Sequence, residues 1–451
     1  MPGVCADCQR RPRPSRHDAG VITNLIERSE VFLKGLVFGC RACGQCVLRA
    51  NAMTCPMRCP KGLRNGPCGG TLEGKCEVHP ERTCIHVLIH TRRHRGRAEP
   101  APIMPAIDHA LVTTASLMNA CTGADKGCRD PLPALSTAGW AEGPPRTASR
   151  LEAALRAGRF AVTTELRAPR GADLTRIRRE ANALRDSFDA INATAYLSGN
   201  PSLPSSVVAR ELQAMGVEAI AQLTARDCTR TTFAGELFSL SQGQVANLLC
   251  LTGDWRTGRP MVKPVYDLDS SLMLYEARHL RDRSKVFHTG EEVAQAPRPF
   301  LGCAINPLSD PIDVPVRRLR VKADCGAEFA QTQVLTETVR LARFMELARA
   351  QDLPRRVAIL AGIPVVTSLK ALDHLHRVAG VTVDPGFAAR LRAAPDLRAA
   401  GIAEAERLCA EAKAIPGIAG VHLMLFGMDY SALIDVSQTI NPKETTCPSP
   451  A

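Results

Sequence analysis

Cysteine is the residue type that stands out in this 451-residue chain. Ten of its 18 cysteines lie in the first 84 residues, and the densest part begins Cys40-x2-Cys43-x2-Cys46. Three thiolates at such short spacings converge on one small centre and need a further ligand from elsewhere in the chain. We therefore expect metal ligation by eight cysteines, namely Cys40, Cys43, Cys46, Cys55, Cys59, Cys68, Cys76 and Cys84.

Iron–sulfur clusters and zinc are the two kinds of centre that this spacing fits. The CxxCxxC start and the Cys–Pro pairs at Cys55 and Cys59 resemble the ligation of [4Fe–4S] clusters, and eight cysteines suffice for two clusters or for one cluster and one zinc ion. Zinc alone is the alternative, because all-cysteine zinc sites use similar spacings. Disulfides are disfavoured, since we find no secretory leader. Cys5 and Cys8 are either a further half-site or part of a frayed terminus, and we favour the second interpretation.

A second set of polar residues follows short β-like runs further along the chain. Its members are Glu165, Thr194, Arg226, Asp227, Asp254, Asn306 and Gln333. Each alone could be a cap or a turn, but together they predict one polar pocket if the ends of these runs meet in space. His422 opens the last run, and we expect it to fill the opposite end of the fold.

The elements that must position these side chains alternate regularly between residues 148 and 440. The β-like runs are 161–166, 189–195, 219–225, 246–253, 300–306, 328–333, 357–363 and 421–427. Each is followed by room for a helix, so the pattern predicts an α/β fold of the (β/α)8 TIM-barrel type, in which catalytic groups gather at the C-terminal ends of the strands. No GxGxxG follows any run, which disfavours a doubly wound dinucleotide-binding sheet.

Composition divides the chain into four parts: a Cys-rich metal or iron–sulfur module at 1–97, a linker rich in Pro, Ala, Gly and Ser at 98–147, the barrel at 148–440 and a tail at 441–451. Nine of the 12 net positive charges come from the first 100 residues, with 17 Lys and Arg against 8 Asp and Glu. The charges are dispersed and only 4% of residues are aromatic, which argues against a nucleic-acid partner.

No run approaches the roughly 18–20 continuous apolar residues of a membrane helix. We expect a soluble, cytoplasmic protein without a membrane partner. The sequence leaves open whether the chain forms a homo-oligomer.

Two stretches of the sequence resemble one enzyme family. The string CPKGLRNGPCGGTLEGKCEVHPERTC (59–84) resembles the Cys-rich module of acetogen-type methylenetetrahydrofolate reductases, where it usually ends the accessory subunit. The predicted barrel resembles the catalytic subunit, through TTELRAPRG (163–171), FDAINATA (188–195), LTGDW (251–255) and VKADCGAEFAQTQ (321–333). The order of the two stretches resembles a fusion of two functions in one chain.

The resemblance implies a flavin-dependent methylenetetrahydrofolate reductase, an oxidoreductase of one-carbon metabolism and methionine biosynthesis that acts on a CH–NH group. Such an enzyme interconverts 5,10-methylenetetrahydrofolate and 5-methyltetrahydrofolate. The implied alternative is a non-catalytic electron-transfer or scaffold subunit of such a reductase, which would not need the catalytic carboxyls that Glu165 and Asp254 provide.

Roles for individual residues follow from the same resemblance. Glu165 matches the general acid that protonates the folate as its five-membered ring opens, which requires a raised carboxyl pKa. Asp254 matches an aspartate that lies near the flavin and contacts the pterin, and Gln333 matches a glutamine that contacts folate. The resemblance places Thr194, Gln222, Thr252, Gly253, Asp254 and Lys322 at flavin-binding positions, with Gln222 standing where other members have a flavin-contacting histidine.

The resemblance implies FAD as the cofactor, with FMN as the alternative. Thr252 stands where FAD-dependent members have arginine, and Pro315 stands where they have aspartate. Electrons would come from NADH or NADPH at the flavin, or from an electron-transfer protein through the Cys-rich module.

Overall fold

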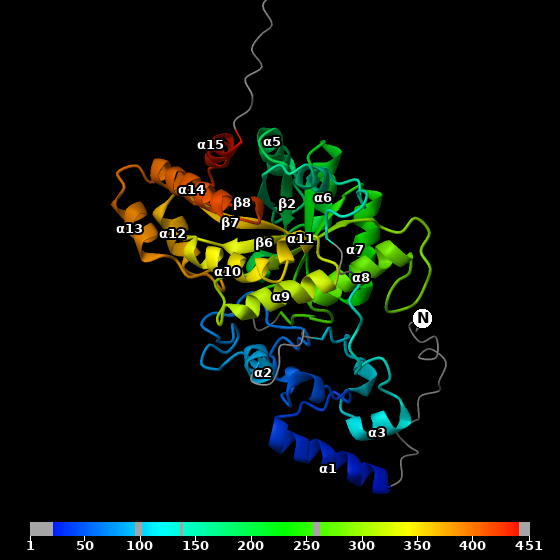
Figure 1. Cartoon of the computed structure of the whole chain (residues 1–451). Helices are drawn as coiled ribbons and strands as arrows, with labels where there is room; N and C mark the ends of the chain where they lie inside the picture. Colours follow the sequence, from blue (N-terminus) through cyan, green and yellow to red (C-terminus); the bar gives the residue numbers. More distant parts are fainter. Residues whose placement is uncertain (1–20, 95–101, 136–138, 256–261, 442–451) are drawn as a thin grey trace, which may run out of the picture.

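Eight parallel strands close into one barrel, as the alternating pattern predicted (Figure 1). The computed structural model describes residues 21–94, 102–135, 139–255 and 262–441; Cys5, Cys8 and all but the first residue of the expected tail lie outside them. The strands are β1 (Ala161–Arg167), β2 (Ala190–Thr194), β3 (Ala219–Thr224), β4 (Asn247–Leu251), β5 (Phe300–Ile305), β6 (Phe329–Val334), β7 (Ala358–Val366) and β8 (Ile418–Phe426). β1 pairs with both β2 and β8, which closes the sheet and confirms the (β/α)8 barrel.

Helices surround the barrel and also form part of the N-terminal module. In the module and the segment after it they are α1 (Val21–Phe38), α2 (Ile85–His94) and α3 (Ser116–Thr122). Around the barrel they are α4 (Arg150–Arg156), α5 (Thr175–Leu184), α6 (Ser205–Ala214), α7 (Arg230–Gln242), α8 (Ser270–Arg283), α9 (Asp313–Asp324), α10 (Val339–Arg349), α11 (Leu353–Arg356), α12 (Leu369–Leu375), α13 (Pro385–Ala393), α14 (Leu397–Ala414) and α15 (Ser431–Ile440). No described helix is long and apolar enough to span a bilayer.

Apolar side chains close one end of the barrel. Side chains alternate along each strand between the interior and the surrounding helices. Near the strand N-termini, the inward-facing rings of Phe300 and Phe329 stack with centroids 5.1 Å apart, and Trp140 packs on Phe300. A Cβ on Gly302 would come within 2.2 Å of the Phe329 ring, so this position needs glycine. The polar site is therefore confined to the other end.

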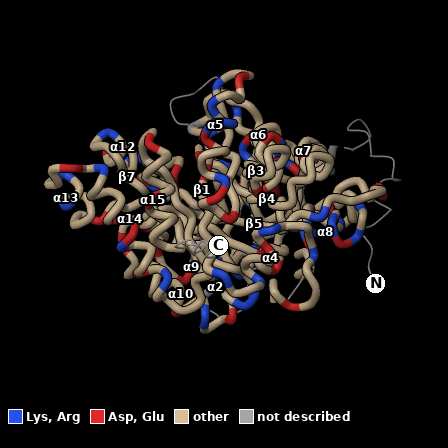
Figure 2. Tube along the Cα trace, turned by 90° about the horizontal axis from the view of Figure 1, so that it is seen from above, with Lys and Arg blue, Asp and Glu red and all other residues tan. Residues whose placement is uncertain are grey.

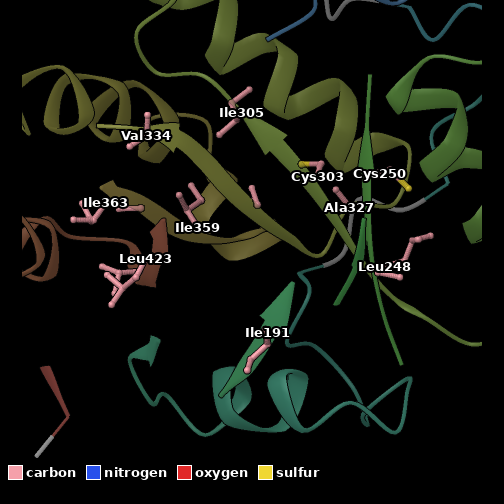
Figure 3. Packing of buried hydrophobic residues seen from close by; sticks show 14 of the residues in the cluster. Ile191, Leu248, Cys250, Cys303, Ile305, Ala327, Val334, Ile359, Ile363 and Leu423 are labelled. Carbon is pink, nitrogen blue, oxygen red and sulfur yellow. The ribbon is translucent and has the colours of Figure 1, made fainter. Parts of the chain in front are cut away.

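The alternate residues of the strands face outward and pack under the helices. Figure 3 shows Ile191, Leu248, Cys303, Ile359 and Leu423 among these buried side chains. Full burial of an aliphatic side chain contributes about 1.5–3 kcal/mol, so this layer supplies much of the stability of the barrel.

The N-terminal module lies against the C-terminal ends of the strands, beneath α9 in the view of Figure 1. The amide of Asn306, just after β5, donates to the carbonyl oxygen of Gly69 at 2.8 Å. The amide of Asn65 donates to Asp269, which precedes α8, at 2.9 Å. The module thus covers the mouth of the barrel.

Residues 102–135 and 139–147, within the segment expected as a linker, pack along the barrel. Ile103 is buried and pairs with Leu132 in an isolated β-bridge, close to the module. Trp140 lies at the opposite end, where its backbone N–H donates to Arg355. This segment therefore runs from the mouth of the barrel to its closed end. Over the surface of the molecule, Lys and Arg are interspersed with Asp and Glu (Figure 2).

Candidate active site at the barrel mouth

A cavity of about 250 Å³ lies where the module meets the C-terminal ends of the strands. All but two of the barrel residues predicted for the site or its polar pocket line it: Glu165, Gln222, Arg226, Thr252, Gly253, Asp254, Asn306, Lys322 and Gln333. The module contributes a further part of the wall, made of Lys61, Pro67, Cys68, Gly69, Gly70 and Glu77. Of these six module residues, sequence reasoning placed only Cys68 in a site, and it did so only as a metal ligand.

Two predicted residues, Asp227 and Thr194, do not line the cavity. Asp227 forms an ion pair with Arg226, which does line it. Thr194 is buried at the end of β2, and its hydroxyl donates to the carbonyl oxygen of Leu166 on the neighbouring strand at 3.2 Å. The next residues, Ala195 and Tyr196, line the cavity instead.

Glu165 projects from β1 into the cavity, and its surroundings favour the protonated form of its carboxyl. Its side chain is 19% exposed, and burial raises its pKa, opposed in part by the positive charge of Arg167. His422 Nε2 lies 4.0 Å from the carboxyl, but burial lowers the pKa of His422 to about 3, so the ring is neutral near pH 7. A neutral neighbour does not stabilise the carboxylate, so Glu165 keeps its proton to higher pH than an exposed glutamate.

The expectation that His422 fills the closed end of the barrel is wrong. His422 lines the cavity, pairs in register with Thr163 of β1, and its Nδ1 lies 3.0 Å from the Thr163 hydroxyl. The alternation of VHLMLF contains the missing signal, because it places His422 and Met424 on the same face, and both line the cavity.

A pair of amides lies beneath the cavity. Asn192 of β2 donates to Gln331 of β6 at 2.7 Å, and Gln331 donates back at 3.2 Å. Both side chains are buried, so mutual hydrogen bonding offsets the cost of burying two polar groups.

Asp254 follows β4 and is open to the cavity. The protein atoms that crowd the mouth withdraw its carboxyl from bulk water and raise its pKa; Glu77 adds to the rise, whereas Lys61 and Arg226 oppose it. Arg226 is itself fixed by an ion pair to Asp227 at 2.7 Å, and one of its N–H groups donates to the backbone carbonyl of Asp254 at 3.3 Å. The two barrel carboxyls of the site, Glu165 and Asp254, therefore have different surroundings.

Hydrogen bonds to nearby backbone groups hold the side chain of Gln333. Its side-chain amide donates to the carbonyl oxygen of Ala379 at 3.0 Å, and its carbonyl oxygen accepts from the N–H of Val334 at 2.9 Å. These bonds hold the amide at the wall of the cavity.

Two buried cations on α9 form another part of the wall. Arg318 and Lys322 are four residues apart, so they share one face of the helix. Lys322 donates to the carbonyl oxygen of Ala304, and burial lowers its pKa to about 8. Arg318 is 6% exposed, and its Nε and Nη1 have no hydrogen-bond partner among the described residues. Such a pair fits an anionic group, and a phosphate-bearing cofactor such as FAD or FMN carries one.

Five of the eight predicted cysteine ligands line one of two separate cavities. Cys40, Cys43, Cys46 and Cys55 line a small separate cavity under α1, and Cys68 lines the barrel mouth. Within the described ranges, no three His, Cys, Asp or Glu side chains are arranged to hold a metal ion. The described residues thus do not show the expected iron–sulfur or zinc centre.

Comparison with known proteins identifies the family of the barrel. Residues 150–437, more than half of the chain, match the family described as methylenetetrahydrofolate reductase. The chain belongs to the methylenetetrahydrofolate reductase family. Residues 21–108 match a second family, described as methylene-tetrahydrofolate reductase C terminal, which here stands at the N-terminal side of the barrel. No curated protein matches the chain.

Two solved structures show distant likenesses to this reductase-family chain. An uncharacterized protein from Clostridium thermocellum, described as binding two copies of 5-methyl-5,6,7,8-tetrahydrofolic acid, is 13% identical with a TM-score of 0.48, over 65% of this chain and 98% of its own. EDTA monooxygenase from Chelativorans is 12% identical with a TM-score of 0.38, over 62% and 92%. At these scores neither bears on function.

Proposed function

We propose that this chain is a flavin-dependent methylenetetrahydrofolate reductase that interconverts 5,10-methylenetetrahydrofolate and 5-methyltetrahydrofolate. The observation that carries the proposal is the placement of Glu165, a carboxyl with a raised pKa, in one cavity with Asp254 and Gln333. In a barrel of this family, these are the residue types that the reaction needs at the mouth: a proton donor, an anion and an amide.

Glu165 acts as the general acid in the proposed reaction. Reduction of the substrate adds one hydride to the bridging carbon and one proton to the nitrogen that this carbon leaves when the five-membered ring opens. Glu165 holds that proton on its carboxyl, because burial disfavours the charged form. In the reverse direction the same carboxylate accepts it.

Asp254 and Gln333 bind and orient the folate. Ring opening places a positive charge on the nitrogen–carbon unit of the substrate, and an Asp254 carboxylate nearby stabilises that charge. Gln333 presents an amide to the cavity from the end of β6. Both residues come from strand ends, so the barrel sets their separation.

The residues at the mouth fit a flavin. Gln222, Thr252 and Gly253 would contact it, and Arg318 with Lys322 would bind its phosphate. When bound, this cofactor supplies hydride chemistry. The proposed donor of electrons is NADH, NADPH or an electron-transfer protein. The metal centre stays a prediction, and no step is assigned to it.

The first test is spectroscopic. Protein purified without oxygen should show flavin absorbance, extraction should identify FAD or FMN, and elemental analysis should quantify iron and zinc. Methylenetetrahydrofolate should reoxidise the reduced flavin with formation of 5-methyltetrahydrofolate, and NADH, NADPH and a reduced viologen dye should be compared as donors. Absence of flavin after reconstitution with FAD and with FMN would overturn the proposal and favour the scaffold subunit.

A further inference from the structure

The module places a buried ion pair in the barrel mouth. Lys61 Nζ lies 2.6 Å from Glu77 Oε2, and the two side chains are only 2% and 9% exposed. Both belong to the N-terminal module, whereas the barrel residues proposed for chemistry in the same cavity come from strand ends. Burial of a pair of charges is costly unless the remaining polar atoms find partners.

Those partners are the backbone on either side of Asp254. Lys61 Nζ donates to the carbonyl oxygen of Gly253 at 3.0 Å. The other oxygen of Glu77 accepts from the backbone N–H of Trp255. The pair therefore holds the two residues that flank Asp254 in the chain, 192 and 178 positions away from Lys61 and Glu77 respectively.

Neighbouring residues fit this contact closely. A Cβ on Gly70 would lie 2.2 Å from Glu77 Oε2, so glycine at this position leaves room for the carboxylate. The ring of Tyr266 lies 5.7 Å from Lys61 Nζ, stacks on Trp255 and donates its hydroxyl to the carbonyl oxygen of Gly253 at 3.3 Å. The segment that carries Asp254 is thus fixed from the module and from the barrel.

We propose that Lys61 and Glu77 are positioning residues that hold Asp254 at the folate site, so that the N-terminal module completes the active site. The role of Lys61 and Glu77 in catalysis rests on the proposed reductase function. Their contact with the backbone on either side of Asp254 does not depend on that function. The charged groups that face Asp254 are Glu77 and Lys61 from the module and Arg226 from the barrel.

The two members of the pair act on Asp254 with opposite sign. Loss of the Glu77 charge in Glu77→Gln should lower the pKa of Asp254, and loss of the Lys61 charge in Lys61→Met should raise it. Because Asp254 is open to the cavity, each shift should be on the order of 0.5–1 pH unit. A merely structural role would not produce two shifts of opposite sign.

Trp255, the direct neighbour of Asp254, reports this ionisation without any need for activity. The chain has two tryptophans, so a Trp140→Phe background leaves Trp255 as the single emitter. Its emission should titrate with pH, and the step should vanish in Asp254→Asn. In parallel, the acid limb of the folate reaction should move down in pH for Glu77→Gln and up for Lys61→Met, with a lower kcat/KM for folate.

Exposed charges of the same module are the controls: Lys75→Met and Glu73→Gln should change neither the emission midpoint nor the pH profile. Emission midpoints that move in the same direction, or not at all, would overturn the inference. Opposite midpoint shifts in a protein without folate reduction would keep the contact to Asp254 and reject the reductase function.

Discussion

The barrel and the module are stabilised in different ways. In the barrel, backbone groups of neighbouring strands satisfy one another around a closed ring, and apolar side chains fill both faces of the sheet. In the module, side chains reach backbone carbonyls: Gln45 donates to Cys43 and Asp108, and Arg64 donates to Pro105 and Cys128. The stability of the barrel is spread over many similar contacts, whereas the module depends on few buried polar groups.

The cavity at the barrel mouth lies on the border between these two regions. The barrel contributes the groups proposed for chemistry, and the module contributes a wall that fixes one of them. Substitutions in the barrel interior should therefore affect catalysis or global stability, whereas substitutions in the polar contacts of the module should affect docking over the mouth.

The largest effect is expected for Glu165→Gln. Removal of a general acid slows the folate reaction by about 10²–10⁴-fold, whereas flavin content and its reduction by the electron donor should be unchanged. Stopped-flow absorbance separates the two half-reactions. Asp173→Asn, which alters an exposed carboxyl beside α5, is the matched control. Equal loss in both half-reactions would contradict the assignment.

Phe329→Ala should produce the largest loss of stability. The ring lies inside the barrel and stacks on Phe300, so its removal leaves a cavity and should cost about 3–5 kcal/mol in free energy of unfolding. Urea denaturation measures the loss. Val339→Ala on the exposed face of α10 should change stability by less than about 0.5 kcal/mol. Similar values for the two variants would refute the described packing.

Asn65→Ala tests the docking of the module. The Asn65 amide donates to Asp269 and to the carbonyl oxygen of Met104, so its loss leaves buried groups unpaired and should cost about 1–3 kcal/mol. Limited proteolysis should then cleave the module faster while the barrel resists. Substitution of the exposed Gln351 by alanine is the control. Unchanged cleavage would show that this contact does not hold the module.

The loss of folding stability at acid pH should depend on one buried histidine in each region. Burial lowers the pKa of His422 in the barrel to about 3 and that of His86 in the module to about 4. On acidification these histidines bind protons at a higher pH in the unfolded chain than in the folded protein. The free energy of unfolding is therefore at its full value above about pH 6.5 and falls below that pH, by up to about 1.4 kcal/mol per pH unit for each group.

Substitution of either histidine by asparagine should therefore flatten the acid slope of the free energy of unfolding, measured between pH 7 and 5. His376→Asn, at an exposed position, should keep the wild-type slope. A wild-type slope in both buried variants would show that neither ring is held neutral.

Prediction from the sequence was most complete where the chain repeats a local pattern. Each of the eight β-like runs overlaps a strand, because alternating or continuous apolar residues bury one or both faces of a sheet. Glu165, Asp254 and Gln333 were found because parallel strands bring their C-terminal ends to one rim. His422 was misplaced because β8 begins at Ile418, three residues before the predicted run at 421, so His422 lies in the middle of the strand and not at its start.

By itself, the sequence determined the barrel, its polar rim and a Cys-rich N-terminal part, because local spacing and residue type are enough to predict all three. Only the tertiary structure decided that this part lies over the rim and that Lys61 and Glu77 flank Asp254. Their contacts join residues far apart in the chain. Such contacts depend on the packing between the two regions, and no local propensity encodes that packing.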